Sequence, residues 1–267
     1  MFVTFLSDFG LQDDFVGTCH GVIKRIAPDV EVIDVTHGIP AQSVMQGALV
    51  LANTVPYMPV GVHLAVVDPG VGSTRRALAL RDEEGRIYVG PDNGLLLPAA
   101  ERSGIREAHE IVNPAYALEP VSRTFHGRDI FAPAAAHLAR GVEPGELGPP
   151  IDPAVLVRLE RPEPELRATR IAATVLYVDS FGNMQLNLRR EHLDDAGVQP
   201  GARVELELAG QRYYATAART FSDARRGDLV LYEDSYRNVA VAMNGGNAAE
   251  MLAARAGQEL RVNLNAP

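Results

Sequence analysis

The chain has 267 residues, of which 46% are hydrophobic and 22% are charged, and its formal net charge is −9. This is the composition of an ordinary globular protein, with room for two modest domains. The acidic balance argues against nucleic acid or an anionic membrane as the main partner, and no apolar run approaches the roughly 20 residues that span a bilayer.

The first half of the chain alternates short apolar runs, typical of buried strands, with segments whose apolar residues recur at helical spacing. This alternation predicts an N-terminal α/β domain over residues 1–160 with a mostly parallel sheet. The predicted strands are residues 2–6, 30–35, 62–67, 77–80 and 87–89, the last two as a hairpin, and the predicted helices are 14–26, 41–53 and 129–140.

The second half of the chain has a different sequence pattern. Six prolines between residues 143 and 164 and a charged stretch place a linker near 161–166. Beyond it, short strand-like runs separated by glycine or polar turns predict a small antiparallel, β-barrel-like domain over residues 167–267. No internal repeat is apparent. The predicted strands are residues 171–178, 203–208, 212–218, 228–232, 239–243 and 260–263.

Polar residues gather where three of the predicted parallel strands end. The stretches 7–10, 34–38 and 68–76 each contain an aspartate and a glycine. One such stretch is usually turn chemistry, but three in succession favour a ligand site, because α/β sheets bind ligands beyond the carboxyl ends of their strands. Asp68 and Arg75 lie at the ends of a Gly-rich loop that matches neither a Walker A motif nor a dinucleotide-binding fingerprint.

Three other features are open to a structural or a functional interpretation. His126 stands just before the predicted helix at 129–140 and is either a structural histidine or a site residue. Residues 179–183 form either a plain turn or a polar ligand site in which Phe181 stacks on a flat ring. The Gly-rich turn at 244–247 is either a helix start or a place where backbone N–H groups bind a base edge or an anion.

Several kinds of chemistry are not expected. The seven histidines form neither an HxH nor an HExxH pair and no G-x-S-x-G elbow is present, so we expect no metal site and no cofactor. The single cysteine, Cys19, excludes an intramolecular disulfide, and its apolar helical surroundings favour a core residue over a nucleophile. Together with a start that lacks signal-peptide features, this predicts a cytoplasmic protein.

Five short motifs occur in the order of a known family. They are residues 7–10, 67–72, 90–96, 124–129 and 181–183. Together, over nearly the whole chain, they resemble the S-adenosylmethionine (SAM) hydroxide adenosyltransferases, or SAM hydrolases, which are relatives of fluorinase and chlorinase. The resemblance implies an α/β domain, a small β domain, and a homotrimer whose active sites lie between one chain's N-terminal domain and a neighbour's C-terminal domain.

The resemblance also implies roles for particular residues and names SAM and adenosine as the small-molecule partners. Asp68, Arg75 and His126 match the catalytic trio of the hydrolases. The implied substrate-binding residues are Asp8 at the ribose hydroxyls, Asp179 and Ser235 around the methionine, Phe181, Asn183 and Phe221 at the adenine, and Asn93 within the 90–96 motif.

The halogenating relatives differ at the trio, which favours water over halide for this chain. A tyrosine tends to replace Asp68, an aromatic residue replaces His126, and the fluorinating member has a serine at the position of Gly127. The implied reaction is displacement at C5′ of the ribose by a water or hydroxide that Arg75 and His126 hold, with His126 as the candidate proton acceptor.

Two alternatives stay open. A 5′-halo-adenosine synthase would form a halogenated product from SAM and chloride. A non-catalytic SAM or adenosine sensor would bind its ligand without releasing methionine.

Overall fold

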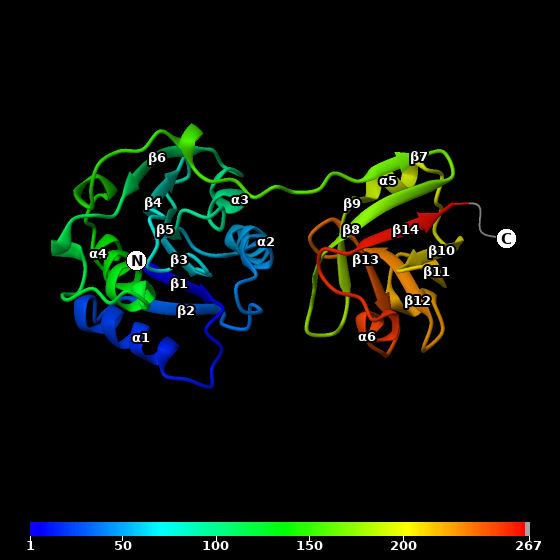
Figure 1. Cartoon of the computed structure of the whole chain (residues 1–267), viewed down its shortest axis with the longest axis horizontal. Helices are drawn as coiled ribbons and strands as arrows, with labels where there is room; N and C mark the ends of the chain where they lie inside the picture. The colour runs from blue at the N-terminus through cyan, green and yellow to red at the C-terminus, as the bar shows by residue number, and fades with distance from the viewer. Residues whose placement is uncertain (265–267) are drawn as a thin grey trace. The chain divides into compact units, whose positions relative to one another are not determined.

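The computed structural model describes residues 1–264, and the chain separates into two compact units, Met1–Leu159 and Glu160–Pro267 (Figure 1). The expected linker at 161–166 overlaps a short strand, β7 (Glu165–Arg167), because these residues pair with the start of β8 (Arg170–Val178). Among the described residues, no helix is long and apolar enough to cross a membrane.

The first unit is built on a six-stranded sheet of order β2-β1-β3-β5-β4-β6. The strands from β2 to β5 in this order run parallel, whereas β4 runs antiparallel to both β5 and β6. This confirms the mostly parallel sheet and the hairpin. The strands are β1 (Phe2–Ser7), β2 (Glu31–Thr36), β3 (Val62–Val66), β4 (Ala77–Asp82), β5 (Ile87–Pro91) and β6 (Ile105–Glu110).

Helices cover both faces of this sheet (Figure 1). Because side chains alternate along a strand, β1 sends Val3 and Phe5 into the core beneath α1 and α4 and Leu6 into the core beneath α2 and α3. The helices are α1 (Phe15–Ile26), α2 (Val44–Thr54), α3 (Leu97–Ala100) and α4 (Ala132–Ala139), which continues from a π-helical turn at Gly127–Phe131, and short 3₁₀ turns lie at Val55–Tyr57, Pro114–Tyr116, Pro144–Glu146 and Pro153–Val155.

Helix α1 shows why these residues form this element. Val16, Cys19 and Ile23 recur at helical spacing and are buried on one face. Lys24 and Arg25 in the last turn complement the helix dipole. The helix ends at Ile26, ahead of Pro28, whose ring disfavours helical backbone at the residue before it.

The second unit is a closed barrel of seven strands in the order β14-β10-β11-β12-β13-β9-β8, which the pairing of β14 with β8 completes. The barrel was expected, but one pair differs: β11 and β12 run parallel, because the chain between them crosses back along the barrel through a 3₁₀ turn. The further elements of this unit are β9 (Met184–Arg189), β10 (Arg203–Leu208), β11 (Gln211–Ala218), β12 (Leu229–Glu233), β13 (Asn238–Met243), β14 (Glu259–Asn263), α5 (Arg190–Asp195), α6 (Ala248–Leu252) and the 3₁₀ turn Phe221–Asp223.

Two hairpin loops of the barrel repeat one five-residue design. Asp-Ser-Phe-Gly-Asn at 179–183 joins β8 to β9, and Asp-Ser-Tyr-Arg-Asn at 234–238 joins β12 to β13. In each loop the first aspartate accepts from the backbone N–H groups two and four residues later, at 2.8–2.9 Å. Because β9 and β13 are neighbours, both loops lie at the same end of the barrel. This five-residue similarity is confined to the two loops.

Candidate active site

Asp68, Arg75 and His126 form one hydrogen-bonded chain in the first unit. Asp68 follows β3, Arg75 precedes β4, and His126 directly precedes the π-helical turn. Arg75 Nε donates to both carboxylate oxygens of Asp68 at 3.0 and 3.1 Å, and Arg75 Nη2 donates to Asp68 Oδ2 and to His126 Nδ1, the latter at 2.8 Å. The structure thus brings the predicted trio together, with the guanidinium in the middle.

These contacts assign the proton on His126. An arginine only donates, so Nδ1 of His126 accepts and the hydrogen of the neutral ring lies on Nε2. Burial and the charge of Arg75 hold the pKa of His126 below its usual value of 6.5, so the ring stays neutral at neutral pH. In this arrangement Nε2 offers a donor, and the role of His126 as proton acceptor stays a prediction.

The loop between Asp68 and Arg75 holds its shape through close backbone packing. Gly72 has a φ of 77°, and a Cβ there would lie 2.4 Å from the carbonyl oxygen of Arg123. Glycine is therefore required at this position. Ser73 Oγ accepts from the backbone N–H of Arg75 at 3.2 Å, which turns the chain back toward Asp68.

The ion pair is largely withdrawn from solvent, since the side chains of Asp68 and Arg75 are 6% and 10% exposed. The guanidinium carbon of Arg75 also lies 5.0 Å from the centre of the Phe131 ring, within reach of a cation–π interaction. Arg75 is therefore held by a carboxylate, an imidazole and an aromatic face. A buried arginine pre-positioned in this way stabilises negative charge without reorganising.

Asp8 lies at the same edge of the sheet, directly after β1. Its backbone N–H donates to Val66 O at 3.4 Å, at the end of β3, and its Oδ2 accepts from the backbone N–H of Gln42 at 2.8 Å. Burial raises the pKa of Asp8, and the nearby negative charge of Asp68 raises it further. The two carboxylates thus share one edge of the sheet, where α/β proteins bind ligands.

Asn93 and Cys19, two other residues of the first unit singled out in the sequence, have structural surroundings. Asn93 Nδ2 donates to Val67 O at 2.8 Å, and its Oδ1 accepts from the backbone N–H of Leu95. The amide of Asn93 therefore braces the end of β3 beside Asp68. Cys19 is fully buried, and burial raises the pKa of its thiol to about 12, so it is a core residue as expected.

The second unit has a cavity of about 680 Å³ at the end of the barrel that carries the two repeated loops. This is within the range of small-molecule sites. Predicted residues Asp179, Phe181, Asn183, Phe221 and Ser235 all line it. The structure thus gathers every residue predicted for this half of the site around one space.

The cavity combines aromatic faces with two carboxylates. Phe181, which lines the cavity, is 76% exposed, and the ring centres of Phe221 and Tyr232 lie 4.9 Å apart. Burial, followed by the charge of Asp234, raises the pKa of Tyr232 to about 12, so its hydroxyl remains a donor. Exposed rings beside carboxylates suit a ligand with a flat aromatic part and a positive charge.

Models of two family domains match this chain. The SAM hydroxide adenosyltransferase N-terminal domain matches residues 3–148, and the C-terminal domain of the same family matches residues 173–261. The chain belongs to the SAM hydroxide adenosyltransferase family.

The relatives of this SAM hydroxide adenosyltransferase family member include proteins named as hydrolases and proteins named as fluorinases. The (R)-S-adenosyl-L-methionine hydrolase of Salinispora arenicola is 48% identical to it over 97% of both chains. The fluorinase of Nocardia brasiliensis is 30% identical, over 98% of this chain and 96% of its own. A crystal structure of an uncharacterized conserved protein from Thermotoga maritima has 33% identity and a TM-score of 0.90, covering 98% of this chain and 99% of its own.

Sequence reasoning did not find every polar residue that lines the cavity of this family member. Asp234, Gln185 and Tyr177 also line it, and Gln185 Nε2 donates to Asp234 Oδ2 at 2.7 Å. A signal for Asp234 was available, because residues 234–238 repeat the pattern of residues 179–183. Gln185 and Tyr177 lie within strands, where no local pattern marks them.

Proposed function

We propose that this protein hydrolyses SAM to adenosine and L-methionine, by attack of water or hydroxide on C5′ of the ribose. The observation that carries the proposal is the continuous chain from Asp68 through Arg75 to His126. It is supported by family membership and by 48% identity to a relative named (R)-S-adenosyl-L-methionine hydrolase.

The difficulty of the reaction lies with the nucleophile, since bulk water has a pKa of about 15.7. Arg75 Nη1 is not used in the contacts with Asp68 and His126, and together with His126 Nε2–H it offers two donors to an oxygen anion. Both donors stabilise hydroxide relative to water, and the proton released when hydroxide forms leaves the site for bulk solvent. Asp68 balances the charge of Arg75, so that the pair does not repel the sulfonium. Positioning of the nucleophile supplies up to about 7–11 kcal/mol.

The substrate contacts divide between the two units. Asp8 accepts from the ribose hydroxyls, and Asn93 acts by holding the strand end beside Asp68. In the barrel cavity, Phe181, Phe221 and Asn183 bind the adenine. Asp179 and Ser235 bind the amino and carboxylate groups of the methionine.

We further propose a homotrimer, in which the first unit of one chain and the barrel of a neighbouring chain complete each active site. A head-to-tail arrangement of this kind gives a closed ring where the rotation between neighbouring copies closes. The free, buried Cys19 is compatible with a reducing compartment, and we place the protein in the cytoplasm.

Incubation of the purified protein with SAM, with and without chloride or fluoride, tests the reaction. We expect equal amounts of adenosine and methionine, at rates that do not depend on halide. Appearance of a 5′-halo-adenosine would assign the protein to the halogenating branch. Binding of SAM without methionine release would make it a sensor. Either result would overturn the proposal.

A further inference from the structure

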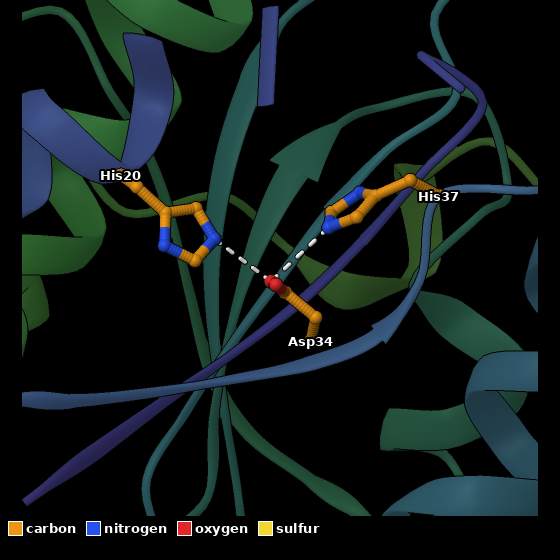
Figure 2. A group of neighbouring side chains, drawn as sticks. All are labelled: His20, Asp34 and His37. Atoms are coloured by element: carbon orange, nitrogen blue, oxygen red, sulfur yellow. Dashed lines mark hydrogen bonds and ion pairs between the residues drawn. The ribbon is translucent and has the colours of Figure 1, made fainter. Parts of the chain in front are cut away.

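A cluster of two histidines and an aspartate lies in the first unit, apart from the catalytic trio. Figure 2 shows His20 from α1 and His37 from the loop after β2 pointing their rings at Asp34 of β2 from opposite sides. His20 Nε2 lies 2.8 Å and His37 Nε2 lies 3.1 Å from the same oxygen, Asp34 Oδ1. Among residues 1–264, these three form the one set of three or more His, Cys, Asp or Glu side chains whose potential ligand atoms all lie within 4.8 Å of one another.

His37 is the most buried member of the cluster. Its side chain is 2% exposed, and its Nε2 is buried without a well-aligned hydrogen bond among the described residues, although it lies near Asp34. Leaving a polar nitrogen buried and unpaired costs free energy. A buried imidazole nitrogen that faces a carboxylate oxygen without a well-aligned hydrogen bond is also placed to bind a cation together with that oxygen.

The surroundings fix His37 in the orientation that a metal ligand requires. Its other ring nitrogen, Nδ1, lies 2.7 Å from Ser7 Oγ, a fully buried hydroxyl at the end of β1. Metal-binding histidines typically use their second nitrogen in this way, which sets the tautomer and the ring orientation. The Phe5 ring packs against both imidazoles, with ring centres 4.7 Å from His37 and 6.1 Å from His20.

From this geometry we propose that His20, Asp34 and His37 form a binding site for a divalent first-row transition metal, with zinc as the reference ion. Two imidazoles and one carboxylate are a recurrent donor set for such ions. Ligand atoms about 2.1 Å from one ion at ordinary coordination angles lie roughly 3.0–3.4 Å apart. The separations of 2.8 and 3.1 Å from Asp34 Oδ1 lie close to that range, and all three ligand atoms lie within 4.8 Å of one another, so the two imidazoles would close on an ion through rotation of their side chains.

The ion would join three segments that are distant in sequence. It would tie α1 to β2 and to the loop after β2, which also carries Gln42, the residue whose backbone N–H donates to Asp8. Ser7, the residue that orients His37, directly precedes Asp8. A bound ion would thus link these segments close to Asp8, the candidate ligand of the ribose. Its three ligands are not members of the trio.

Calorimetric titration of the metal-stripped, untagged full chain with zinc chloride tests the proposal. We expect saturation at one zinc ion per chain and no comparable heat with magnesium, because imidazole ligands disfavour magnesium. His20→Ala and Asp34→Asn should each weaken zinc binding by at least about 100-fold, and Ser7→Ala by about 10–100-fold through loss of the support to His37. The control is His192→Ala, a histidine on α5 in the barrel unit, which should bind zinc as the wild type does.

Binding of Co²⁺ gives a spectroscopic signal that would not change if the three residues only stabilised the fold. The wild type should give visible absorption bands of protein-bound Co²⁺ that the His20→Ala and Asp34→Asn variants lack, and circular dichroism verifies that these more exposed positions tolerate substitution. Failure of the wild type to bind zinc stoichiometrically would overturn the proposal. So would variants that bind zinc with wild-type affinity.

Discussion

One guanidinium organises the proposed catalytic trio. Arg75 donates to Asp68 on one side and to His126 on the other, and it packs on Phe131. Because the arginine can only donate, it also decides which nitrogen of His126 carries the hydrogen. In the proposed mechanism the two residues therefore act as paired donors toward a negatively charged nucleophile.

Removing either donor should remove most of the activity. Loss of one pre-positioned donor to a developing or bound anion typically costs about 10²–10³-fold in rate. We expect His126→Ala and Arg75→Ala to lower kcat/KM for adenosine release by at least about 100-fold. Arg106→Ala, which changes an exposed arginine on β6, is the matched control. Wild-type turnover in His126→Ala would refute the assignment.

The pH dependence follows from the neutral state of His126. Its pKa lies below 6.5, because of burial and the charge of Arg75, and a protonated ring can no longer accept from Arg75. We expect protonation of the His126 ring, followed by NMR of its ring signals, to occur below pH 6.5, and the loss of kcat/KM that it causes to fall in the same range. The linked stability has the same sign: it is present above the unfolded-state pKa and is lost as pH falls through the lower folded-state pKa. Protonation of the His126 ring centred above pH 6.5 would contradict this account.

The family resemblance implies that the fluorinating member has a serine at the position of Gly127. A Cβ at Gly127 would lie 2.9 Å from Phe9 Cζ, and Phe9 is held by the rings of Phe5, Phe15 and Phe125. Gly127→Ser should therefore lower the free energy of unfolding by about 1–3 kcal/mol through overpacking, without forming a halogenated product. Urea unfolding measures the first effect, and product chromatography with fluoride measures the second.

At the scale of elements, the two repeated loops differ at their fourth position. Gly182 has a φ of 81° and a Cβ there would lie 1.9 Å from Asn247 Oδ1, whereas Arg237 adopts a φ of 67° with its side chain 85% exposed. Gly182→Ala should cost about 2 kcal/mol or more, because backbone strain and a clash add together. Arg237→Gly should change stability by less than about 1 kcal/mol, since relief of strain offsets added freedom of the unfolded chain. Equal effects in urea unfolding would contradict this contrast.

The elements that sequence analysis found are those with clear patterns. The apolar runs of β1 and β3 and the helical spacing in α1 were enough for the parallel sheet. Strand β6 was not predicted, because four of its six residues are charged or histidine. The parallel pairing of β11 with β12 was also missed, since it depends on how the connection crosses the barrel and not on the pattern of either strand.

The same reasoning explains the outcome for the sites. Asp68 and Arg75 lie in one Gly-rich loop and could be paired from sequence, and His126 joined them only through the family resemblance. The cluster of His20, Asp34 and His37 was not expected, because searching for histidine pairs at short spacing cannot detect ligands that α1 and β2 bring together. Folding creates that proximity, and no local motif records it.

At the scale of the whole molecule, each unit has its own core and carries its own share of the proposed site. If three copies share their sites in a ring, two inactive variants should complement each other. We expect co-expressed His126→Ala and Phe181→Ala/Phe221→Ala chains to recover about a quarter of wild-type activity, the share of sites in which both halves are intact. Light scattering should give the mass of a trimer. Mixed trimers without recovered activity would contradict the shared site.

The origin of the new oxygen in the product tests the central claim most directly. The protein is incubated with SAM in water enriched in oxygen-18, and the adenosine is analysed by mass spectrometry. Attack of solvent at C5′ places one heavy oxygen on the 5′ carbon of adenosine and none in methionine. Adenosine without the label, or no adenosine at all, would contradict the account.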